Sequence, residues 1–225
     1  MTSQTGRSIP DELLHAAVSL LDEHGPDALQ TRKVASAAGT STMAVYTHFG
    51  GMRSLIAAVA KEGLRQFDAA LTVPQTDDPV ADFFVAGAAY RRYAIERPHM
   101  YRLMFGSTSA HGINAPARNV LTLTVAEIEE RHPSFARLVR AVHRSALAGR
   151  ITVCSADDDA AVVATAAQFW ALIHGFVMLE LAGYYGDDGS AVAPVLGSMT
   201  SNLLVALGDS PQRVNQSQQA ALTAS

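Results

Sequence analysis

Apolar residues recur at helical spacing through most of the chain, and the first such run lies near the N-terminus. Ser8 and Asp11 stand three positions apart, as in a capping box, and Pro10 suits a first helical turn. Gly25-Pro26 has the residue types that follow the end of a helix. The apolar positions in between fall on one helix face: Leu13, Leu14, Ala17, Val18, Leu20 and Leu21. The pattern predicts an amphipathic helix over about residues 8–25.

Two short helices and a longer one are predicted next. Their expected ranges are Thr31–Ala38, Thr42–His48 and Met52–Leu71, with breaks at Gly39 and at Gly50-Gly51. Small side chains around the first break would let the two short helices cross closely. The segment therefore has the organisation of a helix-turn-helix, in which one short helix enters the major groove of DNA and its partner crosses the phosphates.

The second short helix has a core face and an exposed face. Ser41 is expected to cap it, and Val45 and Phe49, four residues apart, should face the core. We expect the opposite face to meet base edges and the flanking cations to meet phosphates. The residues predicted to bind DNA are Arg32, Lys33, Ser41, Thr42, Met43, Ala44, Tyr46, Thr47, His48 and Arg53.

The chemistry of this exposed face is mild. It holds no Arg, Asn or Gln, which are the side chains that pair bidentately with guanine or adenine. Thr42 and Thr47 can offer single hydrogen bonds, and Met43 can contact a thymine methyl group. Tyr46 and His48 can reach flanking phosphates. We therefore expect moderate sequence specificity that depends on DNA shape and on dimerisation.

Charge is distributed unevenly. The 225-residue chain has a net charge of −4, so it is not a general binder of polyanions. Residues 29–65 carry a net charge of +4, the balance of Glu62 against Arg32, Lys33, Arg53, Lys61 and Arg65. A local basic island on a helix-turn-helix pattern favours nucleic-acid binding over a compact three-helix core without a ligand.

The polar, proline-bounded segment 73–79 is predicted to be a linker. It divides a DNA-binding domain, 8–71, from a larger helical domain, 78–208, and residues 209–225 are predicted to be a polar tail. No strand-like alternation is strong enough to predict a sheet, so the expected fold class is all-α. Helices are expected at Val80–Glu96, His99–Phe105, Ala115–Arg131, Ser134–Ala148, Asp158–Tyr184 and Ala191–Leu207.

The segment VASAAGTSTMAVYTHFGGMRSLI resembles the signature of TetR-type transcriptional regulators. Val34, Ala35, Ala38, Gly39, Ser41, Tyr46, Phe49 and Leu55 fall in register with that signature. The resemblance implies a homodimeric, all-α regulator, usually a repressor, with a ligand-binding C-terminal body. Two positions depart from the pattern. Met52 replaces a Lys that anchors the fourth helix on phosphate, a role that Arg53 could take, and Gln30 replaces a capping Ser or Thr, for which Thr31 could substitute.

The second half is similar to the subgroup of this family named for a W-H-G pattern. The similarity is carried by Trp170, His174 and Gly175 and by the stretch AYRRYAIERPHMYRLMF at 89–105. The family resemblance implies that the last two long helices form a four-helix bundle with a partner subunit, and a two-fold dimer of this kind would bind a near-palindromic operator. Trp170 and His174 share a helix face, and His174 is either an effector contact or a satisfied core histidine.

Aromatic and Met side chains in the same domain suggest a small, largely apolar effector. The residues predicted to line its site are Tyr90, Tyr93, Tyr101, Met104, Phe105, Trp170 and His174. Taken singly, each of them is favoured as an ordinary core residue, and a helical repressor without an effector is the alternative. Arg137, Arg140 and Arg144 lie on one helix face, which is predicted to be solvated rather than an anion site.

Other classes of protein are disfavoured. The sequence has no nucleophile elbow, phosphate loop or metal-ligand spacing, so neither an enzyme, nor a cofactor, nor a metal is expected. The apolar run 160–182 is long enough to cross a bilayer, but acidic flanks, Gln168 and His174 favour a helix buried in protein. The lone Cys154 and an N-terminus without an apolar signal region favour a cytoplasmic protein.

Overall fold

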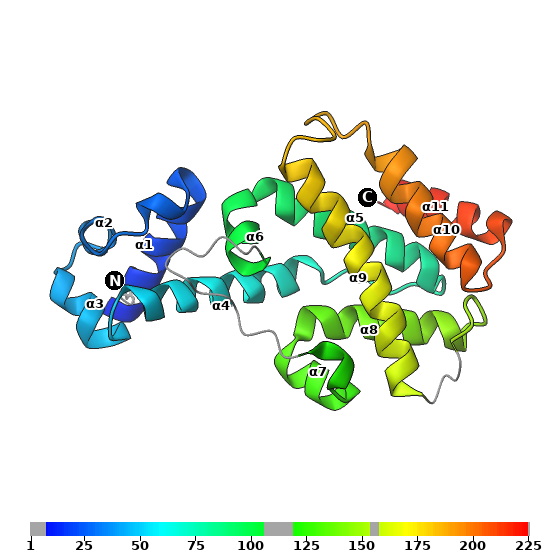
Figure 1. Cartoon of the computed structure of the whole chain (residues 1–225), viewed down its shortest axis with the longest axis horizontal. Coiled ribbons are helices and arrows are strands. Elements are labelled where there is room, and N and C mark those ends of the chain that lie inside the picture. Colours follow the sequence, from blue (N-terminus) through cyan, green and yellow to red (C-terminus); the bar gives the residue numbers. More distant parts are fainter. Residues whose placement is uncertain (1–7, 106–118, 154–157, 225) are drawn as a thin grey trace, which may run out of the picture. The chain divides into compact units, whose positions relative to one another are not determined.

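The computed structural model describes residues 8–105, 119–153 and 158–224, and within these ranges the regular elements are helices, with no strand (Figure 1). The all-α prediction is confirmed. The α-helices are α1 Ile9–His24, α2 Thr31–Ala37, α3 Thr42–Phe49, α4 Met52–Ala70, α5 Pro79–Glu96, α6 Pro98–Phe105, α7 Val125–Arg131, α8 Pro133–Leu147, α9 Asp159–Leu181, α10 Ser198–Ala206 and α11 Pro211–Ala224. Short turns of other helix types lie at η1 Pro26–Ala28, η2 Val120–Thr122 and η3 Val192–Gly197.

The chain forms two compact units. The first, which we call the head, contains the described residues up to 66 together with 96–105. The second, the body, contains 67–95 and the described residues from 119 onward. Helix α4 begins in the head and its last turn belongs to the body, whereas α6 returns to the head after α5. The boundary between head and body thus follows the packing of the helices, whereas the predicted domain ranges, 8–71 and 78–208, were set by the polar linker.

Helix α1 is the centre of the head. Its buried Leu13, Ala17 and Leu21 face inward, and α1 contacts α2, α3 and α6. The Ser8 hydroxyl caps it, accepting a hydrogen bond from the backbone N–H of Asp11 at 3.4 Å. At its other end Gly25 has a φ of 75°, a left-handed value that favours glycine. The predicted start and stop of this helix are confirmed.

Helices α4 and α6 approach each other closely at Gly63. A Cβ at this position would lie 2.9 Å from Met100 Cγ and 3.0 Å from Met104 Sδ. Both methionines are almost fully buried. An ion pair between Arg97 and Asp22 also ties the start of α6 to α1. These contacts explain why α6 belongs to the head despite its position after α5.

The body is built around α8 and α9, which pack against each other. Phe169 and Phe83 meet with ring centroids 4.4 Å apart, and Trp170 and Phe135 lie 5.4 Å apart. The buried core continues through Val80, Ile128, Phe135, Ala136, Val139, Val142, Ile151, Val162, Val163, Ala166, Phe169, Leu204 and Val214. This single cluster draws on α5, α7, α8, α9, α10 and α11.

Helix α9 is long and apolar enough to cross a membrane by length and composition, and it alone among the described helices meets that test. In the structure it packs against α8 and α10. Near its C-terminus the buried Glu180 accepts hydrogen bonds from Arg91 Nη2 at 2.7 Å and Nε at 2.9 Å. The buried carboxylate of Glu180 is thus paired with an arginine of the same protein. This pairing agrees with the prediction that the apolar helix is buried in protein.

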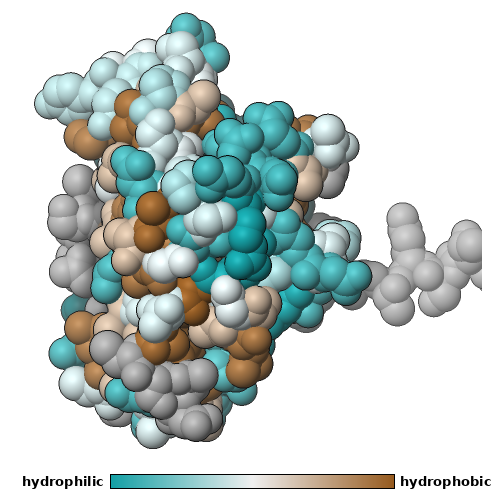
Figure 2. All heavy atoms as spheres, turned by 90° about the vertical axis from the view of Figure 1, so that its right-hand side faces the viewer, coloured by the Kyte–Doolittle hydropathy of each residue, from teal (hydrophilic) through white to brown (hydrophobic). Residues whose placement is uncertain are grey.

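Residues 209–225 were predicted to be a polar tail, and this is wrong for the described part. Helix α11 occupies Pro211–Ala224 and packs on α10 through the buried Val214, Ser217 and Ala221. Its inner face is narrow and partly polar, so hydrophobic periodicity does not reveal it. Figure 2 shows the face of the molecule on the side of α10 and α11, where hydrophilic side chains form a broad band and hydrophobic ones lie in separate patches.

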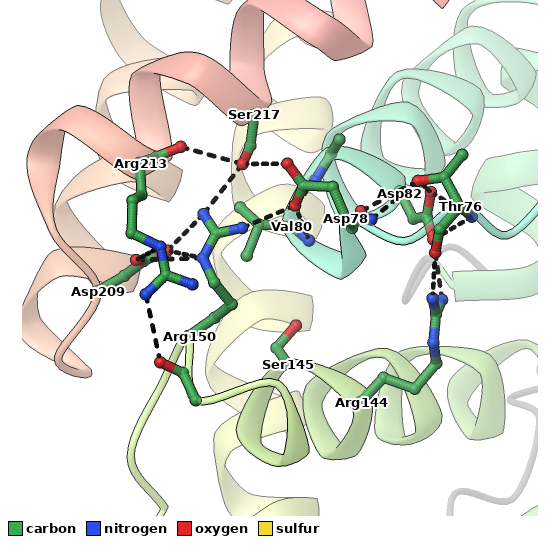
Figure 3. A network of polar contacts seen from close by, with 12 residues as sticks. Thr76, Asp78, Val80, Asp82, Arg144, Ser145, Arg150, Asp209, Arg213 and Ser217 are labelled. Carbon is green, nitrogen blue, oxygen red and sulfur yellow. Dashed lines mark hydrogen bonds and ion pairs between the residues drawn. The ribbon is translucent and has the colours of Figure 1, made fainter.

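A buried polar network fixes α11 in place (Figure 3). The guanidinium of Arg150 donates to Asp78 at 2.7 Å, to Asp209 at 3.0 Å and to the Ser217 hydroxyl at 2.9 Å. Ser217 in turn donates to Asp78 at 2.6 Å. Burial alone would raise the pKa of Asp78, but hydrogen bonds from Ser217 and the backbone and the charge of Arg150 lower it overall. The network joins the start of α5, the end of α8 and the α10–α11 turn.

Two further predicted ranges are corrected. The helix expected over Ala115–Arg131 is broken: its first residues lie outside the described ones, and η2 is followed by the Thr124 capping box that begins α7. The helix expected over Ala191–Leu207 begins as the π-helical turn η3 before α10. The cap at Thr124 starts a new helix, and the wider π-helical turn η3 changes the helix type before α10. Neither change interrupts the apolar pattern of the sequence, so the pattern does not reveal them.

Candidate nucleic-acid interface

The turn between α2 and α3 is fixed by the backbone. Gly39 has a φ of 64°, and the N–H of Thr40 donates to Ala35 O at 2.9 Å. The N–H of Gly39 donates to Ser36 O at 3.1 Å. This pair of bonds is a Schellman motif, which requires a left-handed residue after the helix and so favours glycine. The predicted break at Gly39 is confirmed, and it sets the direction in which α3 leaves α2.

Helix α3 has the two faces that its sequence predicts. Val45 is fully buried and Phe49 is partly buried, so this side packs on the head. Met43 is 68% exposed and Tyr46 is 57% exposed. The other predicted contact residues of the helix are also exposed, except the half-buried Ala44: Ser41, Thr42, Thr47 and His48. The structure thus brings the predicted base-facing residues together on one open surface.

The ends of α3 differ from prediction in one respect. Ser41 occupies the N-cap position, but its side chain makes no capping hydrogen bond. Gln30 likewise stands at the N-cap of α2 without capping it, and Thr31 is the first helical residue. At the other end Gly50 is left-handed with a φ of 72°, as the Gly-Gly break predicts. The Ser41 hydroxyl remains exposed at the edge of the open face.

The cations beside this face are exposed. Arg32, Lys33 and Arg53 have no ion-pair partner among the described residues, and none lies next to an acid in the sequence. Arg65 behaves differently, since its guanidinium donates to Glu62 at 2.7 Å and thereby holds the pKa of that carboxyl below its usual range. Three unpaired cations beside an acid-free helix give the head a positive surface suited to phosphates.

The residues predicted for an effector site fall into two groups. Tyr101, Met104 and Phe105 lie on α6 in the head, where Tyr101 and Met104 are buried. The other four, Tyr90, Tyr93, Trp170 and His174, lie in the body. Prediction from sequence did not separate these groups, because α5 and α6 are continuous in the chain but belong to different units.

Within the body, some of the predicted residues do come together. The Tyr90 hydroxyl lies 3.5 Å from His174 Nδ1, and the rings of Trp170 and His174 are 6.4 Å apart. The Tyr90 and Tyr93 rings both pack on Phe67, at 4.9 Å and 5.2 Å. Burial lowers the pKa of His174, so its imidazole is neutral at pH 7. A neutral imidazole beside a phenol can both donate and accept hydrogen bonds in an otherwise apolar setting.

The arginines of α8 do not form an anion site, because each binds a carboxylate, and only Arg140 is exposed, as the predicted solvated face requires. Arg137 donates to Asp68 at 2.6 Å, and Arg144 donates to Asp82 at 2.8 Å and to the carbonyl of Thr76 at 2.7 Å. Arg140 pairs with Glu129 at 2.7 Å. Spacing along one helix could not reveal these partners, which come from other elements.

These features define a helix-turn-helix DNA-binding head attached to an all-helical body. Comparison with known proteins gives the family. Residues 13–59 match the family model "Bacterial regulatory proteins, tetR family", and residues 83–202 match "Tetracyclin repressor-like, C-terminal domain". The chain belongs to the TetR family of bacterial transcriptional regulators, a family of DNA-binding regulators and not of enzymes. The W-H-G subgroup stays a prediction.

Individual relatives agree with this assignment. The chain is 36% identical over 86 residues to the class A tetracycline repressor from transposon 1721 of Escherichia coli, a match covering 38% of this chain and 39% of the repressor. It is 28% identical over 193 residues to an uncharacterized HTH-type transcriptional regulator of Mycobacterium tuberculosis, covering 81% and 75%. A solved structure of unknown function from Rhodococcus sp. RHA1 matches with a TM-score of 0.68 and 26% identity, covering 93% and 100%.

Proposed function

We propose that the protein is a homodimeric, ligand-responsive repressor that binds a near-palindromic operator in the cytoplasm. The observation that carries the DNA-binding part is the open face of α3 flanked by the unpaired cations Arg32, Lys33 and Arg53. In this proposal Thr42, Met43 and Thr47 meet base edges, while Tyr46, His48 and the cations meet phosphates. Phosphate contacts fix the register on the duplex, and the few base contacts select the sequence.

A homodimer is supported by the apolar surface of the last long helices. Leu179 on α9 and Met199 on α10 are each 42% exposed, and Val205 on α10 is 37% exposed. A helix as apolar as α9 needs cover on more than one side, and a second copy of the same helices would supply it. Two-fold symmetry would then present two copies of α3, and half-sites of matching symmetry would be separated by about one or more helical turns of DNA.

An effector site is proposed around Tyr90, Trp170 and His174. The neutral His174 and the Tyr90 hydroxyl would orient a polar group of a small, largely apolar molecule whose remainder packs on aromatic rings. Because α4 runs from the head into the body, it would carry a shift in the body to the head. The switch requires only that the effector and the DNA prefer different states of the dimer.

The proposed DNA binding is tested by selecting duplexes from a random pool with the full chain. We expect enrichment of a near-palindromic sequence, bound by a species that sediments as a dimer. Replacing Thr42 and Thr47 together by Ala should change the selected sequence, whereas Arg140→Ala, on an exposed pair in the body, should not. Failure of the wild-type chain to enrich any sequence would contradict the proposal.

The proposed effector site is tested by a thermal-shift screen of small aromatic and apolar compounds. A true effector should raise Tm and weaken binding to the selected operator. His174→Gln should reduce the Tm shift, while His143→Gln, at an exposed position on α8, serves as the matched control. If no compound raises Tm or alters operator affinity, the alternative of an effector-independent repressor takes its place.

A further inference from the structure

Met43 is placed at the centre of the DNA-facing surface. Successive residues of an α-helix are about 100° apart around its axis, so Met43 lies roughly opposite the fully buried Val45. At 68% exposure it is more exposed than any other large hydrophobic side chain described in the head. It is also the second residue of α3, in the N-terminal half that makes base contacts in helix-turn-helix complexes.

The chemistry of Met43 restricts what it can recognise. A thioether is apolar and at best a weak hydrogen-bond acceptor, so it cannot pair with the polar edge of guanine, adenine or cytosine. In the major groove the apolar feature that a base pair offers is the C5 methyl group of thymine. Met43 has a flexible chain that adapts to such a contact and buries exposed apolar area in making it.

The neighbours of Met43 do not override this contact. The other exposed residues of α3 are Thr42, Tyr46, Thr47 and His48, and none of them carries an amide or guanidinium that could pair bidentately with a base. The Tyr46 ring leans toward the far end of the helix, where a Cβ on Gly51 would lie 3.9 Å from Tyr46 Cε1. An apolar contact by Met43 is therefore the main means of base selection that this weakly polar face offers.

We propose that Met43 is a specificity-determining residue that reads the C5 methyl group of a pyrimidine in each half-site. This inference rests on the proposed operator binding. Thymine is the ordinary bearer of that methyl group, but 5-methylcytosine presents it at the same ring position. The proposal therefore extends to sensing cytosine C5 methylation: wherever Met43 contacts a pyrimidine, the methylated base is preferred over the same base without its methyl group.

The test uses operators selected by the full chain. They are resynthesised so that each variant duplex differs from the selected one by one methyl group per half-site. Each thymine is replaced by deoxyuracil, which removes only the C5 methyl group and keeps base pairing. One symmetric position should lose about fourfold in affinity per half-site, the value expected for one buried methyl group. At that same position, 5-methylcytosine should bind better than cytosine. Affinity is measured by fluorescence anisotropy at fixed salt.

Matched variants assign the effect to Met43. Met43→Leu keeps an apolar side chain and should keep the methyl preference, whereas Met43→Gln keeps the length but should lose it. Thr47→Ser removes a methyl group from a neighbouring exposed side chain and should keep the preference. The proposal is overturned if no thymine is sensitive to deoxyuracil, if Met43→Gln retains the sensitivity, or if Thr47→Ser abolishes it. If the wild-type chain selects no operator at all, the proposed function fails together with this inference.

Discussion

The cations beside α3 and the arginines of the body are used in opposite ways. In the body Arg91, Arg137, Arg144 and Arg150 each bind a carboxylate from another element. In the head Arg32, Lys33 and Arg53 lie beside α3 without an ion-pair partner among the described residues. A paired arginine fixes structure, whereas an unpaired exposed one keeps its charge available to a polyanion. The overall charge of −4 hides this difference, because the acids that outnumber the bases lie elsewhere.

The largest effect is expected from removing the buried cation of the body. Arg150→Ala would remove the cation shared by Asp78 and Asp209, whose side chain is fully buried, and would leave Asp209 with only the longer ion pair to Arg213 at 3.9 Å. Breaking a buried pair on one side typically costs about 3–5 kcal/mol. Urea denaturation should show this loss, while Arg140→Ala, whose pair with Glu129 is nearly half exposed, should cost less than about 1 kcal/mol. Equal losses of unfolding free energy in the two variants would show that the buried network around Arg150 does not stabilise the fold more than an exposed ion pair does.

The next effect compares two glycines inside helices. Gly63→Ala in the head would push a methyl group against Met100 and Met104, and overpacking of this kind costs about 1–3 kcal/mol. Gly87→Ala in the body would place its methyl group 3.7 Å from Ile173, an ordinary contact, and should be neutral or stabilising by up to about 1 kcal/mol. Chemical denaturation of both variants checks the sign. A stabilising Gly63→Ala would mean that α4 and α6 separate easily.

A smaller change in free energy is expected from the exposed cations. Replacing Arg32 and Lys33 together by Ala should weaken binding to all duplexes alike, by about tenfold at moderate salt, without changing the selected sequence. The slope of log affinity against log salt should become shallower by about 0.9 for each phosphate that the variant no longer neutralises. Arg65→Ala is the matched control, because Arg65 is already paired with Glu62. An unchanged salt slope in the double variant would remove these two residues from the interface.

The smallest effect concerns pH. Burial lowers the pKa of His174 in the folded state, so the unfolded chain binds the proton more readily. Stability should therefore be full above the ordinary histidine pKa of about 6.5 and should fall as pH drops below it. His174→Gln should flatten the dependence of Tm on pH between about 7 and 5. The same dependence in wild type and variant would assign it to other groups.

Sequence predicted the head more fully than the body. Glycines with positive φ mark the ends of α1, α2 and α3, so local chemistry is enough to place Gly39 and Gly50. In the body the decisive contacts join residues far apart in the chain. Arg150 and Asp78 were not singled out from sequence, although Asp78 directly before Pro79 is a recognisable N-cap and its Oδ1 accepts from the N–H groups of Val80 and Ala81. The inner face of α11 was missed because it includes a serine.

The contribution of α11 to the buried network also bears on protein synthesis, because α11 follows the other elements of the network in the chain. A nascent chain released after Leu207 would already contain Arg150 and Asp78 but would lack Asp209 and Ser217, which complete the network. Its buried cation would be only partly satisfied, and the inner surface of α10 would be uncovered. Incomplete translation products of this kind would therefore have a less stable body, open to proteolysis, even when their head is intact.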